Sequence, residues 1–90
     1  MKLSIFSMYD KKAETYANPV MFEKPLLAQR AIENLLMDGG DSELHRHPED
    51  FTLFHIGYFD PDTAAIEVIS PVAVINLHEA AARVKAAREA

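Results

Sequence analysis

The 90-residue sequence contains no cysteine and no tryptophan, and only three glycines. Without cysteine there can be neither a disulfide nor a thiolate metal site, which favours a reducing compartment. The apolar start at residues 1–6 gives way to charged residues at 10–12, well short of a signal-peptide core. No stretch approaches the roughly 20 apolar residues of a membrane helix. We therefore expect a cytoplasmic protein with no membrane association.

The usual signatures of catalysis are missing as well. The sequence has no Gly-x-Ser-x-Gly motif and no glycine-rich phosphate loop. Carboxylates occur in pairs at Glu49/Asp50 and Asp60/Asp62, but their expected positions in turns account for them without a general acid. The sequence therefore predicts a protein that is not an enzyme and that needs no cofactor.

What the chain does contain is typical of one globular domain. Hydrophobic residues make up 49% of it and charged residues 26%, which is an ordinary globular composition. Ninety residues are enough for one modest core and leave little material for a deep substrate cleft. We expect residues 1–90 to form a single domain.

The net charge of −5 is unevenly distributed along the chain. Residues 1–30 contain five basic and three acidic side chains, whereas residues 31–75 contain nine acidic side chains and Arg46 as the one basic residue. Residues 76–90 contain three basic and two acidic side chains. The acidic middle would repel phosphates. A nucleic-acid surface must therefore come from the N-terminal part, with or without the last helix, and the alternative is ordinary solvated charge.

The first half of the sequence predicts a strand, a weaker strand and a helix. Residues 3–9 are rich in strand formers, and residues 20–22 follow Pro19, which favours an edge position. Pro25 suits the first turn of a helix. Apolar residues at helical spacing follow it, and Gly39-Gly40 ends the helix with a left-handed cap.

The second half predicts a hairpin and a second helix. Residues 51–59 and 64–69 read as strands joined by an Asp-Pro-Asp-Thr turn, and residues 70–71 are expected to end the second strand. Gly57 indicates a bulge or the close approach of another backbone. Asn76 is a plausible N-cap for an alanine-rich helix. The class is therefore α+β, with a three- or four-stranded, mostly antiparallel sheet packed by one or two helices.

A polar loop is expected at residues 41–48, and it carries two histidines. His45 and His47 alternate around an arginine and could present two imidazoles on one side of an extended segment. With Glu49 or Asp50 they would offer ligands for zinc or manganese, although this spacing is common by chance. The alternative is structural, with a carboxylate binding N–H groups of the loop. His45 and His47 are therefore weak metal candidates, and the prediction is that no metal is bound.

Aromatic residues near basic ones are the better candidates for binding. Exposed rings on a sheet can stack the bases of single-stranded nucleic acid while lysines contact phosphates. Most of the eight phenylalanines and tyrosines are needed for the core, and Tyr58 is expected outside with two others. An outward apolar face could equally mediate self-association. The candidate nucleic-acid-binding residues are Lys2, Lys11, Lys12, Lys24, Arg30, Tyr9 and Tyr16.

Two stretches together resemble a known family. Residues 5–16, Ile-Phe-Ser-Met-Tyr-Asp-Lys-Lys-Ala-Glu-Thr-Tyr, resemble its opening strand and turn. Residues 47–60 match its signature HPEDF-x-LF-x-x-G-x-[FY]-D, and an Ala-x-Arg helix like the one at residues 28–30 lies between the two motifs. The family is the small nonstructural protein of gokushovirus-type microviruses, which are tailless phages with single-stranded DNA genomes. The resemblance covers most of the chain and is weakest over the last helix.

The resemblance implies a nonenzymatic accessory protein in the cytoplasm of a bacterial host. Such proteins are labelled DNA-binding or assigned to viral DNA replication, or to the switch to single-stranded DNA synthesis and packaging. The implied partners are single-stranded DNA and phage replication or packaging proteins. The alternative function is a protein-interaction module that self-associates, or binds a host or phage protein, without touching DNA.

Overall fold

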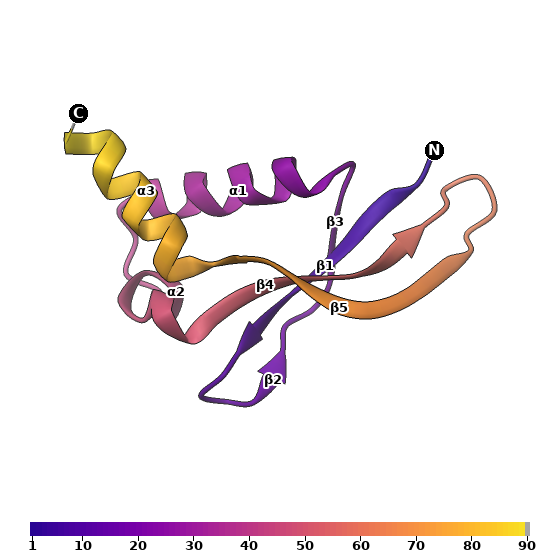
Figure 1. The fold of residues 1–90 in the computed structure, drawn as a ribbon, viewed down its shortest axis with the longest axis horizontal. Coiled ribbons are helices and arrows are strands. Elements are labelled where there is room, and N and C mark those ends of the chain that lie inside the picture. The colour runs from indigo at the N-terminus through magenta and orange to yellow at the C-terminus, as the bar shows by residue number, and fades with distance from the viewer. Residues whose placement is uncertain (90) are drawn as a thin grey trace.

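Strand β1 (Leu3–Asp10) is central to the sheet in the computed structural model, which describes residues 1–89 (Figure 1). One edge of β1 pairs along its length with β4 (Phe51–Phe59). The other edge is shared by two short strands, β3 (Val20–Phe22) and β2 (Thr15–Tyr16). Strand β5 (Ile66–Asn76) pairs with β4. The sheet is antiparallel throughout, in the order β2-β1-β4-β5, with β3 also on β1.

Two helices, α1 (Pro25–Met37) and α3 (Leu77–Glu89), lie against one face of this sheet and against each other (Figure 1). Small residues bring the layers close, because Ala28 of α1 and Ala80 of α3 are fully buried. The central core consists of Phe6, Ala28, Leu53, Ile75 and Ala80. None of the helices in the described part of the chain has the length and apolar character needed to cross a membrane.

The α+β class and the mostly antiparallel sheet are confirmed, but residues 1–89 form five strands and three α-helices. The additional strand is β2, only two residues long, and the additional helix is α2 (Glu43–Arg46). The prediction of a polar loop at residues 41–48 was therefore wrong. The carbonyl of Ser42 accepts the N–H groups of His45 and Arg46 at 3.0 Å each, which winds one helical turn before the 3₁₀ turn η1 (Pro48–Asp50).

The predicted helix ends are confirmed in detail. Pro25 occupies the first turn of α1, and Gly39 just beyond this helix has a φ of 78°, a conformation that favours glycine. At the start of α3, the Asn76 side-chain oxygen accepts the backbone N–H of His78 at 2.7 Å. The amide nitrogen of Asn76 also donates to the Phe51 carbonyl at 3.1 Å. Asn76 therefore fixes the junction between β5 and α3 to β4.

Strand β5 does not end at residues 70–71, as predicted, but continues to Asn76. The register explains how Pro71 is tolerated. Gly57 pairs with Val68, and His55 pairs with Val72, so four steps along β5 match two steps along β4. Proline is compatible with such a bulge on an edge strand because no ladder hydrogen bond needs its missing N–H. The hairpin is therefore longer and more irregular than the sequence indicated.

Candidate nucleic-acid interface

Three aromatic rings gather on the sheet face opposite the helices. Met8 packs toward the helical core, so the alternation of a strand places the neighbouring Tyr9 on the other face. Tyr9 is paired across the strands with Tyr16, and their ring centroids are 4.7 Å apart. Phe54 of β4 completes the cluster, at 6.2 Å from Tyr9 and 5.8 Å from Tyr16. With 46% of Tyr16 exposed, this aromatic cluster offers a stacking surface.

Two predicted cations lie at the same end of the sheet as the aromatic cluster. Lys11 and Lys12 follow β1 directly, in a turn fixed by Asp10, whose carboxylate accepts the N–H of Lys12 at 2.9 Å. The backbone N–H of Lys11 donates to the carbonyl of Asp50 at 2.9 Å. Both lysines border a surface depression of about 570 Å³ that also contains four acidic residues. Their positive charge is therefore partly offset, and a phosphate would meet a mixed electrostatic surface.

The remaining predicted cations lie elsewhere. Lys2, at the opposite end of β1, forms an ion pair with Glu67 at 3.1 Å, and its nitrogen lies 5.9 Å from the centre of the Tyr58 ring. Eight strand residues separate it from Lys11, a distance of about 30 Å. Lys24 precedes α1 near that same far end, and Arg30 lies on the exposed side of α1. The structure thus brings together four of the seven candidates: Tyr9, Tyr16, Lys11 and Lys12.

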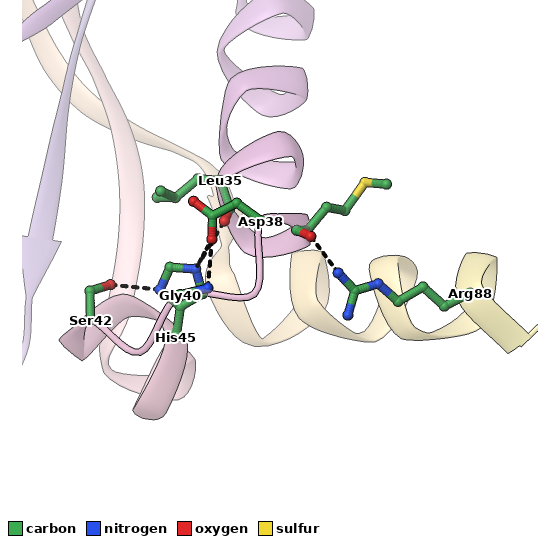
Figure 2. A network of polar contacts seen from close by, with 7 residues as sticks. Leu35, Asp38, Gly40, Ser42, His45 and Arg88 are labelled. Atoms are coloured by element: carbon green, nitrogen blue, oxygen red, sulfur yellow. Dashed lines mark hydrogen bonds and ion pairs between the residues drawn. The ribbon is translucent and has the colours of Figure 1, made fainter.

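The two histidines proposed as weak metal candidates have different surroundings. His45 Nε2 lies 2.9 Å from both the Leu35 carbonyl and the Asp38 carboxylate (Figure 2). Since both groups only accept, Nε2 carries the proton and donates. The other ring nitrogen lies 2.7 Å from the Ser42 hydroxyl. His45 therefore joins the end of α1 to α2, and its ring nitrogens are engaged in that role.

His47 has carboxylates rather than a second imidazole beside it. Its Nδ1 lies 3.8 Å from Glu49, and the possible ligand atoms of His47, Glu49 and Asp50 lie within 4.8 Å of one another. Asp50 is 9% exposed, whereas about half of each of the other two side chains is accessible. Among residues 1–89 this is the group that could hold a metal ion, and His45 does not belong to it. The two imidazoles do not share an extended segment, because His45 lies within the helical turn α2 and His47 follows its last residue.

Asp38 makes the contacts between the end of α1 and α2 sensitive to acid. A hydrogen bond from the backbone N–H of Gly40, at 2.7 Å, is the largest cause that lowers the pKa of Asp38 below its ordinary value of 3.8, and the hydrogen bond from His45 adds to it. A carboxylate whose pKa is lowered by folding stabilises the folded state above its unfolded pKa, and that contribution disappears as pH falls through the folded pKa. The junction should therefore loosen below pH 3.8.

We expect Asp38→Asn to be less stable than the wild type near neutral pH, with a difference that shrinks in acid. Asparagine keeps the oxygen that accepts from Gly40 but carries no charge to lose. Thermal unfolding of both proteins from about pH 6 to about pH 2.5 measures this difference. Asp41→Asn, in the same exposed loop, controls for the loss of one negative charge. An Asp38→Asn difference that stays constant across the range would contradict the assignment.

The residues that form these features lie within the part of the chain that matches a known family. The family described as Phage ORF5 protein matches residues 3–80. The chain belongs to the phage ORF5 family. It is 36% identical to Protein ORF5 of Chlamydia phage 1 over 85 residues, an alignment that covers 88% of each chain. No solved structure matches it. The resemblance to a small phage protein of this type is confirmed.

The family match includes the aromatic cluster, the Lys11–Lys12 turn and the His45 junction, and it ends within α3. Phe54 is the one member of the cluster that sequence reasoning did not select. The run at residues 51–59 is almost continuously apolar, so it gives little indication of which side chains point away from the helices. Once Leu53 is known to be buried, the alternation of a strand places its neighbour Phe54 on the opposite face.

Proposed function

We propose that this phage ORF5 protein is a nonenzymatic accessory protein that binds single-stranded DNA in the cytoplasm of the bacterial host. Its role would lie in viral DNA replication, or in the switch to single-stranded DNA synthesis and packaging. The observation that supports this proposal is the aromatic cluster of Tyr9, Tyr16 and Phe54 beside the Lys11–Lys12 turn. Stacking is available to every base, so sequence preference should be slight.

The net charge limits the affinity of this binding, and the stacking surface determines its preference for single strands. A protein with a net charge of −5 gains little from long-range attraction to DNA, so affinity must come from short-range stacking. Stacking on exposed rings requires bases that are already unpaired, because duplex bases are hidden in the helix. We therefore expect weak binding, with single strands preferred over duplex DNA.

The nonenzymatic part of the proposal is supported by the structural use of the polar side chains. The Ser7 hydroxyl donates to the Ala17 carbonyl at 2.7 Å, which holds the segment between β2 and β3 against β1. His55 Nε2 donates to the Gly57 carbonyl at 3.0 Å. His45 is held in the junction after α1. Ser7 and His55 are thus engaged with backbone groups, whereas His45 also contacts the side chains of Ser42 and Asp38 within the junction after α1.

Fluorescence anisotropy with labelled oligo-dT and with a duplex of equal length tests the proposal at low salt. We expect Tyr16→Ala to weaken single-strand binding by about 5- to 160-fold, which corresponds to the loss of one stacked base. Tyr58→Ala is the matched control, because Tyr58 is a partly exposed tyrosine at the other end of the sheet. Absence of binding at low salt, or equal losses in the two variants, would rule out this interface.

The salt dependence gives a second readout of the same surface. Two phosphate contacts on a single strand predict a slope of log K against log salt of about −1.4. Lys11→Ala and Lys12→Ala together should flatten that slope, whereas Lys2→Ala should leave it unchanged because Lys2 is paired with Glu67 at the far end of β1. A slope unchanged by the double substitution would place the phosphates elsewhere.

A further inference from the structure

The carboxylate of Asp50 is buried without a partner. Asp50 is 9% exposed, and it is the one buried acidic residue among residues 1–89. Its backbone groups are satisfied, because its carbonyl accepts the N–H of Lys11 at 2.9 Å and its N–H donates to the His47 carbonyl at 3.0 Å. Its side-chain oxygens form no hydrogen bond or ion pair with any of residues 1–89. Burial of an unpaired carboxylate is costly, so a cation beside it would stabilise the folded chain.

The Asp50 oxygens open into the surface depression of about 570 Å³ beside the sheet. In the described part of the chain, no side-chain oxygen that is sealed from solvent lacks a hydrogen bond, so the unpartnered oxygens of Asp50 are reached from this depression. Two other acidic residues there are already engaged. Asp10 accepts N–H groups of its own turn, and Glu43 pairs with an arginine of α2 at 2.8 Å. Glu49 has the His47 imidazole at 3.8 Å, so the free carboxylates of the depression are those nearest to His47.

The backbone of η1 brings these side chains together. His47 precedes this 3₁₀ turn and Asp50 ends it, and residues three apart in such a turn lie over one another. The possible ligand atoms of His47, Glu49 and Asp50 lie within 4.8 Å of one another. Around a zinc ion with ligands at about 2.0–2.1 Å, tetrahedral ligand atoms are about 3.3 Å apart. The side chains of His47 and Glu49 are about half accessible, so they are free to close this difference by rotation while the backbone stays in place.

We propose that His47, Glu49 and Asp50 bind a zinc ion through one imidazole nitrogen and two carboxylate oxygens. The imidazole favours zinc over magnesium and calcium, which are usually bound by oxygen ligands. Three protein ligands leave the fourth position of a tetrahedral zinc ion to water. The sequence alone favoured no metal, because it reveals neither the burial of Asp50 nor the absence of a partner for its carboxylate. The site goes beyond the proposed DNA binding and does not depend on it.

Zinc binding would change the charge of the depression. Its four carboxylates and two lysines give it a net charge of −2, which a zinc ion would bring to zero. A phosphate at the Lys11–Lys12 turn would then no longer meet a net negative surface. This consequence rests on the proposed function, whereas the metal site itself does not.

Isothermal titration calorimetry with zinc chloride on the full chain, in the absence of DNA, tests the site. We expect one zinc ion per chain for the wild type. His47→Ala should weaken the affinity by more than about tenfold, because even an outer-shell partner of a metal is worth about 10- to 100-fold. His78→Ala removes an exposed histidine of α3 and should keep the wild-type affinity. A wild type that binds no zinc, or equal affinities in the two histidine variants, would overturn the proposal.

Asp50→Asn tests the buried ligand with little change in shape, and circular dichroism checks that the variant is folded. Zinc should raise the temperature of thermal unfolding of the wild type by mass action and leave that of Asp50→Asn unchanged. Asp41→Asn, which removes an exposed carboxylate outside the cluster, should keep the wild-type shift. Magnesium at the same concentration should shift none of the three proteins. An equal shift by the two metals would indicate a nonspecific acidic surface and overturn the proposal, as would a full zinc shift in Asp50→Asn. Since no DNA is present, these results are separate from the proposed function.

Discussion

Replacing Phe6 with alanine is expected to lower the free energy of unfolding by about 3–5 kcal/mol, the usual cost of removing a buried aromatic ring. Phe6 is completely buried at the point where the sheet meets both helices. Its ring centroid lies 5.1 Å from that of His55 and 6.1 Å from that of Phe22. A domain of this size has about 5–15 kcal/mol of stability in total. The variant should therefore be close to unfolding at physiological temperature.

Urea unfolding at one fixed protein concentration measures this loss, with the concentration held constant because association would add to apparent stability. Phe54→Ala is the matched control. Phe54 belongs to the same sheet but lies on the face without helices and is only partly buried. We expect the control to lose clearly less stability. If Phe54→Ala proves as destabilising as Phe6→Ala, the helix-covered face is not the main core.

Replacing Gly57 with alanine is expected to destabilise the protein by about 1–3 kcal/mol, as overpacking does. A Cβ atom at this position would lie 2.5 Å from the backbone carbonyl oxygen of Glu67. The obstacle is the main chain of β5, which cannot turn away as a flexible side chain could. Gly57 is thus the point of close approach that the sequence predicted, and it coincides with the register shift between His55 and Gly57.

The sign of the Gly57→Ala effect is itself diagnostic. Alanine is intrinsically more favourable than glycine inside a strand by about 0.5–1 kcal/mol, so propensity alone predicts a more stable variant. Gly39→Ala provides a comparison, because Gly39 has a φ of 78° but no atom within 4 Å of the added carbon. That variant should lose about 1–2 kcal/mol from backbone conformation alone. A Gly57→Ala protein as stable as the wild type would refute the close approach to β5.

The elements that could be predicted from the sequence are those specified by neighbouring residues. Pro25 and Gly39 define the ends of α1, and Asn76 begins α3 through a bond to His78 two positions away. Elements that depend on distant partners were missed or shortened. Thr15–Tyr16 becomes a strand only because β1 lies beside it. Strand β5 passes Pro71 only because its bulge matches the register of β4.

In the candidate site, too, features set by neighbouring residues could be predicted and features set by distant residues could not. Tyr9 and Tyr16 were expected among the rings outside the core, and they lie together on the face away from the helices, with 46% of Tyr16 exposed. The ion pair between Lys2 and Glu67 joins residues 65 positions apart, so no local pattern could reveal that this cation is already partnered. Three of the four acidic residues in the depression beside Lys11 come from the segment after α1, and only the folding of the whole chain brings Glu43, Glu49 and Asp50 there. The sequence therefore identified the lysines and aromatic rings, whereas the pairing of distant segments determined which charged groups lie beside them.

The pairing of β1 with β4 also determines when the protein can fold. Leu3 is paired with Phe59, and Phe6 packs against Leu53, Ile75 and Ala80, so the first strand finds its main partners in the second half of the chain. Such distant pairings make folding slower than that of a helical bundle, because the entropy of closing a long loop is lost before the distant contacts can form. As the ribosome extends the chain from its N-terminus, β1 can pair only with the short strands β2 and β3 until β4 emerges. The core therefore forms late in synthesis. A pause in translation before β4 emerges would leave β1 without its main strand partner and without most of the core residues.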